Sequence, residues 1–168
     1  MNKYIELLKS NFSRIKNFSL YLSAAIVSGV LSILFNPFLA ANLSSLDYSI
    51  IGYYSSFAPL FTPILNFSLI SFYVRKYFKI PEDKRQLTLD TIITALLFWG
   101  IISSLLILVG FFIYCQLNKV ELPFFPFALM SVFQLFFNNF LLLYQVNCRM
   151  RSEAKRYFKI TMTASLLT

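Results

Sequence analysis

A long uncharged run from Tyr48 to Val74 constrains the fold more than any other part of this sequence. As a helix, a run of this length can cross about 30 Å of hydrocarbon. It follows Asp47 in a turn that contains no Lys or Arg, and it ends at Arg75 and Lys76. The run therefore predicts a transmembrane helix with basic residues at one end.

The composition agrees with a membrane protein. Hydrophobic residues make up 58% of the chain and charged residues 13%, whereas a soluble domain carries roughly a quarter charged residues. A lipid-facing surface explains this difference. The net charge of +8 lies beside apolar runs, so we expect membrane lipids with anionic headgroups as partners and no nucleic acid.

The apolar runs predict an all-α integral membrane protein, a polytopic helix bundle with four complete transmembrane helices and a truncated fifth. Residues 1–17 are expected to form an amphipathic interfacial helix, because their apolar positions recur every three or four residues. Residues 18–168 would form the transmembrane bundle. We place its spans at about 18–41, 48–74, 87–115 and 122–146, with a partial span from 160.

The distribution of basic residues predicts the orientation of the bundle. Fourteen of the fifteen Lys and Arg lie in the N-terminal arm, after the second span or after the fourth span. The remaining one, Lys119, follows the third span. The positive-inside rule then places the N-terminus in the cytoplasm.

Several short patterns predict where helices begin and bend. Ser44 and Asp47 have the spacing of a capping box, which would start the second span. Asp90 is expected in the first turn of the third span, after a turn at residues 81–83. Pro123 and Pro126 are expected in the first turns of the fourth span.

Three further prolines lie inside predicted spans. Pro37 is expected to kink the first span, because proline removes a backbone donor. Pro59 and Pro63 are four residues apart and predict a bent or unwound second span. Such a bend is either a packing kink or a flexible gate.

The sequence gives no indication of an enzyme, a metal site or a cofactor. It contains no His and no metal-binding or phosphate-binding motif. Cys115 and Cys148 are predicted near opposite membrane faces, too far apart for a disulfide. We therefore expect no catalytic residues, no metal and no cofactor.

Neutral amides are the main polar groups inside the predicted spans. Hydrogen bonds between packed helices explain most such residues. The alternative is a polar cavity for a hydroxyl-rich ligand such as a sugar. The candidates for a sugar-facing lining are Asn36, Asn66, Gln134 and Asn138.

The order of these features resembles the N-terminal part of a polysaccharide biosynthesis protein of the oligosaccharide flippase family. This family belongs to the multidrug/oligosaccharidyl-lipid/polysaccharide exporter superfamily. The resemblance covers nearly the whole chain and rests on residues 36–48, 75–77 and 149–157. Two positions depart from the family pattern. Ser49 replaces a glycine, and Asn66 to Leu69 replace a "small-glycine-leucine" step.

The resemblance implies a two-lobe transporter of about a dozen or more helices around a central cavity, by analogy with known transporter architecture. This chain would supply part of one lobe, and its partners would include missing C-terminal helices of the same protein. Similar proteins move undecaprenyl-diphosphate-linked sugar repeats, such as O-antigen units of lipopolysaccharide, across the inner membrane by alternating access.

A diphosphate headgroup would be captured by basic side chains on the cytoplasmic side. The candidates are Arg75, Lys76, Arg149 and Arg151. Their alternative role is to anchor the topology by contacting lipid phosphates.

Three other functions remain open from the sequence. A cation-coupled multidrug exporter of the same superfamily would favour a carboxylate within the spans, and the central parts of the spans carry none. A membrane-embedded enzyme acting on lipid-linked sugars would show clustered Asp, Glu or His. A small four-helix scaffold would not need the fifth apolar run.

Overall fold

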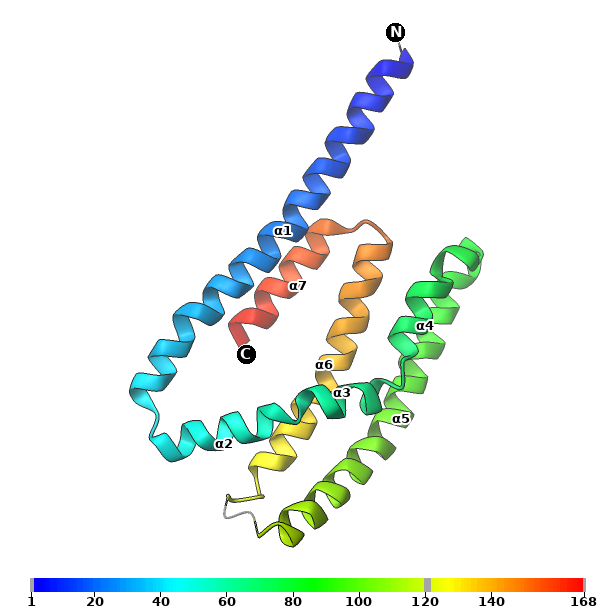
Figure 1. The fold of residues 1–168 in the computed structure, drawn as a ribbon. Coiled ribbons are helices and arrows are strands. Elements are labelled where there is room, and N and C mark those ends of the chain that lie inside the picture. The colour runs from blue at the N-terminus through cyan, green and yellow to red at the C-terminus, as the bar shows by residue number, and fades with distance from the viewer. Residues whose placement is uncertain (1, 120–121, 168) are drawn as a thin grey trace. The chain divides into compact units, whose positions relative to one another are not determined.

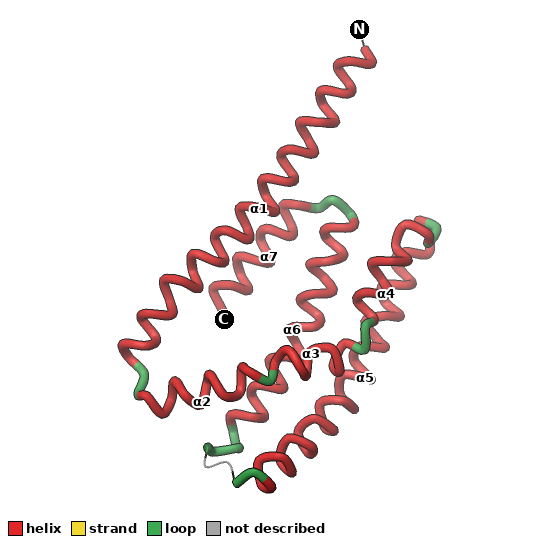
Figure 2. Tube along the Cα trace, viewed as in Figure 1, coloured by secondary structure: helices red, strands yellow, loops and turns green. Residues whose placement is uncertain are grey.

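The computed structural model describes the backbone of residues 2–119 and 122–167 and the side chains of residues 15–119 and 122–165. These residues form helices joined by turns, without a strand (Figure 2). Figure 1 shows the helices in chain order: α1 (Asn2–Asn42), α2 (Ser45–Ser56), α3 (Ala58–Asn66), α4 (Leu69–Lys76), the 3₁₀ turn η1 (Tyr77–Lys79), α5 (Glu82–Leu117), α6 (Phe127–Met150) and α7 (Ala154–Leu167).

Three helical segments in the described chain are long and apolar enough to cross a membrane. They are Ile15–Asn42, Glu82–Leu117 and Phe127–Met150. A fourth span results if Ser45–Asn66 and Leu69–Lys79, which are bent by 59° relative to each other, count as one. The structure therefore agrees with an all-helical membrane protein, whereas it does not support the count of four complete spans and a truncated fifth.

The chain divides into two compact units. Unit 1 combines the residues up to Asn42 with those from Tyr144 onward, and unit 2 comprises Leu43–Leu143. In unit 1, α1 packs against α7. The Ser165 hydroxyl lies 2.8 Å from the Ser28 hydroxyl, and the rings of Tyr21 and Tyr157 meet edge to face at 5.0 Å.

Unit 2 is organised around α5, which packs against α3 and α4 (Figure 1). Its two buried clusters include residues from neighbouring turns of α5. One cluster contains Ile107 of α5, Leu65 of α3 and Val132 of α6. The other is rich in aromatic side chains and is built around Tyr54 and Phe111.

Some local predictions are confirmed. Ser44 is the N-cap of α2: its hydroxyl accepts the Asp47 amide at 3.1 Å and donates to the Asp47 carboxylate at 2.6 Å. Cys115 and Cys148 are both buried free thiols, and their predicted positions near opposite membrane faces stay a prediction. The helix expected over residues 1–17 continues into the first span as α1. Most residues of its predicted apolar stripe, Met1 among them, lie outside the residues whose side chains the structure describes.

The turn predicted at residues 81–83 is wrong. Residues 82–83 belong to the first turn of α5, which is capped by Pro81, so Asp90 lies more than a turn further on and accepts a 3.0 Å hydrogen bond from Gln86. Proline before a helix and acidic residues in its first turn both favour this earlier start.

Two further starts also differ from the prediction. α6 begins at Phe127, after Pro123 and Pro126, because each proline disfavours helical backbone in the residue before it. α7 begins at Ala154, before the expected start at Ile160. In its first turn, Arg156 pairs with Glu153 at 2.8 Å, which supports the helix start.

Candidate functional site

The candidate site is a break in the helical pair α3–α4 of unit 2. Phe67 and Ser68, which join the two helices, have φ values of 44° and 58° and so lie in the left-handed region. Neither residue is glycine, so each carries a steric cost of about 1–2 kcal/mol. Two consecutive left-handed residues of this kind persist where surrounding contacts hold them in place.

The prolines of this segment play a smaller part than the sequence predicts. Pro59 occupies the first turn of α3, where a missing backbone N–H is tolerated. Its position follows a local turn at Phe57, which separates α2 from α3. Pro63 lies inside α3, and its carbonyl accepts the Phe67 amide at 3.0 Å. The 59° bend therefore falls after both prolines, at residues 67–68.

Two side chains satisfy the donor and the acceptor of one helical hydrogen bond that the break removes. In a continuous helix, the Ser68 amide would donate to the Ile64 carbonyl four residues earlier. Here the Ser68 amide donates to Oδ1 of Asn66 at 2.8 Å. The Ile64 carbonyl instead accepts Nε1 of Trp99, a residue of α5, at 2.7 Å. The donor and the acceptor of one helical hydrogen bond are thus both held by side chains.

Aromatic and apolar contacts fix the surroundings of the break. The ring of Phe67 lies 4.8 Å from that of Trp99. Leu65 is buried directly before the break, and Ile70 and Tyr73 are buried on α4 after it. α3 and α4 both pack on α5, so α5 supports both sides of the bend.

An aromatic cluster lies around the junction of α2 and α3. Tyr54 donates a 2.9 Å hydrogen bond to the Pro123 carbonyl, across 69 positions of sequence. Phe57 packs against Phe111 with ring centroids 4.7 Å apart. Partly buried members of this cluster are Tyr53, Phe57, Phe61, Leu122 and Phe124. These contacts hold the loop before α6 against α2.

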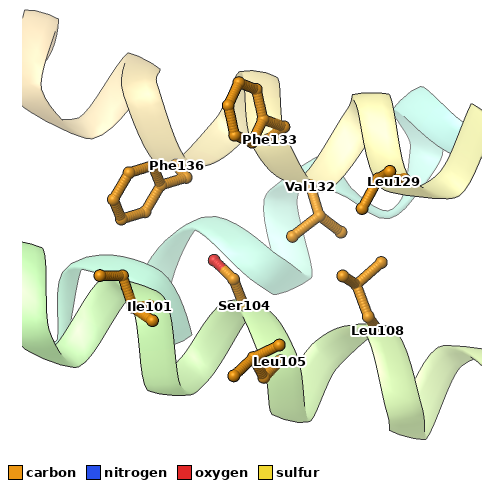
Figure 3. A pocket seen from close by; sticks show the side chains of 8 residues that line it. All are labelled: Ile101, Ser104, Leu105, Leu108, Leu129, Val132, Phe133 and Phe136. Atoms are coloured by element: carbon orange, nitrogen blue, oxygen red, sulfur yellow. The ribbon is translucent and has the colours of Figure 1, made fainter.

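A pocket of about 250 Å³ lies between α5 and α6 (Figure 3). Its wall is apolar except for Ser104, whose buried hydroxyl has no hydrogen-bond partner and points from α5 toward α6. The other lining residues are Ile101, Leu105, Leu108, Leu129, Val132, Phe133 and Phe136. Such a lining suits hydrocarbon and offers no group that could bind a diphosphate.

The predicted headgroup residues occupy helix ends. Arg75 and Lys76 are exposed in the last turn of α4, in unit 2. Arg149 and Arg151 are exposed in unit 1, where the Arg149 guanidinium lies 5.7 Å from the centre of the Tyr157 ring. Capture of a diphosphate headgroup by these residues stays a prediction.

The predicted sugar-facing amides differ in their surroundings. Asn36 is exposed on α1, which continues through Pro37 to Asn42. Gln134 and Asn138 are exposed on α6, and neither lines the pocket of Figure 3. Asn66 uses its side-chain oxygen to hold the Ser68 amide, which is a local structural role.

Sequence reasoning missed the burial of Asn139 and Asn147 and the role of Trp99. Asn139 and Asn147 are buried on α6, and Nδ2 of Asn139 donates to the Leu135 carbonyl at 3.0 Å. The spacing of Asn139 from Val132 and Leu143 places it on the buried face of α6, and this spacing could have identified it. No sequence signal connects Trp99 to Ile64, which lies 35 positions earlier.

Comparisons with known proteins do not assign the site. No protein-family model, no curated protein and no solved structure matches the chain. Among the described residues, no group of three or more His, Cys, Asp or Glu side chains is arranged to hold a metal ion. The chemistry of the site therefore has to be argued from its helices, amides and basic side chains.

Proposed function

We propose that this chain is part of a multi-pass membrane transporter that moves a lipid-linked oligosaccharide from the cytoplasmic to the outer leaflet by alternating access. The observation that carries the proposal is the bent pair of apolar helices, which together are long and apolar enough for one span with a 59° bend inside it. Transporters commonly build their substrate sites and moving parts from interrupted helices.

The family resemblance gives further support at the same position. Its departure from the "small-glycine-leucine" step falls on residues 66–69, which include left-handed Phe67 and Ser68. Glycine adopts this backbone conformation without steric cost. A glycine at this step of the family pattern and the left-handed residues here would therefore serve the same bend.

Neutral side chains support a sugar as the transported group. Exposed amides at Asn36, Gln134 and Asn138 can donate to and accept from hydroxyl groups without a charge. In the transporter proposed here, these amides would face the cavity. Arg75, Lys76, Arg149 and Arg151 would contact the diphosphate at its cytoplasmic end.

Complementation tests this function. The gene that encodes this chain, with any further helices it specifies, is expressed in bacteria that lack their own repeat-unit flippase, and surface polysaccharide is measured. We expect polysaccharide to be restored. Absence of polysaccharide with a panel of repeat units, despite normal membrane levels, would contradict the proposal, and a gain of drug resistance would favour the exporter.

The headgroup role has its own variants in the same assay. Arg75→Ala and Arg149→Ala should each reduce surface polysaccharide several-fold at unchanged protein level, because a diphosphate loses a charged donor. Lys79→Ala is the matched control, since it removes an exposed cation from the loop after α4. Equal amounts of surface polysaccharide in all three variants would show that the arginines do not bind the headgroup and would favour their alternative role as topology anchors.

A further inference from the structure

The break between α3 and α4 contains a hydrogen bond that has been replaced at both of its ends. The Ile64 carbonyl accepts Trp99 at 2.7 Å, and the Ser68 amide donates to Asn66 at 2.8 Å. These two backbone groups are the acceptor and the donor of a single i to i−4 helical bond. Because the Ser68 amide has a single proton, it can bond to the Ile64 carbonyl only after Asn66 releases it.

The local sequence does not by itself require the break. Residues 64–72 contain no proline and no glycine, so every residue there can adopt helical backbone. The left-handed conformation of Phe67 and Ser68 disfavours the bent state by a factor of about five to thirty for each residue. The tertiary contacts of Trp99, Ile70 and Tyr73 with their surroundings offset this cost.

We propose that α3 and α4 form a two-state element that exchanges this hydrogen bond. In the bent state, Trp99 holds the Ile64 carbonyl and Asn66 holds the Ser68 amide. In the straight state, Ile64 and Ser68 bond to each other, and α3 and α4 form one continuous helix. Trp99 acts as a latch for the bent state, because its indole N–H satisfies the Ile64 carbonyl that the bend leaves without a helical donor.

This inference concerns a conformational equilibrium and does not depend on the transported substrate. The bent state predominates because Ile70 and Tyr73 are buried on α4 in that state. A straight helix would carry α4 away from α5 and expose these side chains. Any ligand that bound the straight state more tightly would shift the equilibrium toward it.

Distances between two spin labels measure the equilibrium in lipid nanodiscs. Labels on Ser49→Cys and Phe78→Cys lie on opposite sides of the bend, at exposed positions. Cys115 and Cys148 are replaced by Ala so that the labels react at the intended sites. With a rise of 1.5 Å per residue, removal of the 59° bend lengthens the distance by about 5 Å.

Trp99→Phe keeps an aromatic ring beside Phe67 and removes the N–H donor. We expect the population at the longer distance to rise about fivefold or more, because the bent state then leaves the Ile64 carbonyl without its partner. Phe98→Leu is the matched control, since it changes an exposed aromatic residue one position away. It should leave the distribution unchanged.

A double variant distinguishes the exchange from general destabilisation. Ser68→Gly removes the left-handed cost at residue 68 and weakens the straight helix. Added to Trp99→Phe, it should reduce the long-distance population about fivefold or more. An unchanged distribution in Trp99→Phe would overturn the two-state element. So would a long-distance population that Ser68→Gly does not reduce.

Discussion

Gly100 of α5 lies directly against the ring of Phe136 of α6. A Cβ atom placed on Gly100 would be 2.5 Å from Cε2 and 2.8 Å from Cδ2 of that ring. Contact this close requires a residue without a side chain. The same phenylalanine lines the apolar pocket between the two helices.

Gly100→Ala should therefore displace the Phe136 ring and destabilise the fold by about 1–3 kcal/mol through overpacking. The gain in helix propensity, about 1 kcal/mol, works against this loss. Gly110→Ala is the control, because nothing lies within 4 Å of the position that its Cβ would occupy and only the propensity gain applies. Unfolding of both variants in detergent, followed by circular dichroism, measures the difference. Equal stabilities would contradict the close contact.

The hydrogen bond from Tyr54 to the Pro123 carbonyl gives a second prediction. Tyr54→Phe should destabilise unit 2 by about 1 kcal/mol, because the carbonyl loses a buried partner at 2.9 Å. Tyr48→Phe removes an exposed hydroxyl from the same helix and serves as the control. Thermal unfolding in micelles compares the two, and identical midpoints would show that this bond does not stabilise the loop.

Capping of α2 gives a third prediction. Ser44→Ala should weaken the start of α2 by about 1 kcal/mol, because the Asp47 amide loses its acceptor. Hydrogen exchange of the amides of residues 47–50 should become several-fold faster. Ser49→Ala is the control, since its hydroxyl bonds to the Ser45 carbonyl within the helix. Unchanged exchange in Ser44→Ala would contradict the capping role.

The orientation in the membrane is tested by labelling from one side. In a background with Cys115 and Cys148 replaced by Ala, a membrane-impermeant maleimide added to intact cells should label Ser45→Cys and not Lys79→Cys. The reason is the accumulation of basic residues on the cytoplasmic side. Both positions are exposed, so burial does not protect either one. The reverse pattern would place the N-terminus outside.

The features that the sequence predicts correctly depend on neighbouring residues. Ser44 caps Asp47 three positions later, and the long apolar helices follow from uninterrupted hydrophobic runs. The start of α5 has an equally local signal, Pro81 followed by two acidic residues, although these residues also suit a turn. In each case the residues that cause the feature are neighbours in the sequence, so a local pattern is enough to predict it.

The break at Phe67 and Ser68 could not be predicted from the same patterns. Pro59 and Pro63 predicted a bend at positions where the chain lacks backbone donors. The observed bend instead depends on an indole from a different helix. The contact between Tyr54 and Pro123 is equally remote in sequence. A single sequence gives no measure of such pairings, because side-chain hydrogen bonds between distant helices follow no fixed spacing.

Trp99, which holds the bend, is the one tryptophan of the sequence. The near-ultraviolet emission of residues 1–168 therefore arises mainly from a single indole, whose N–H is bonded to the Ile64 carbonyl. Excitation at the red edge of the absorption band, where tyrosine does not absorb, selects this indole alone. The fluorescence of Trp99 therefore reports on the surroundings of the bend in the second apolar segment.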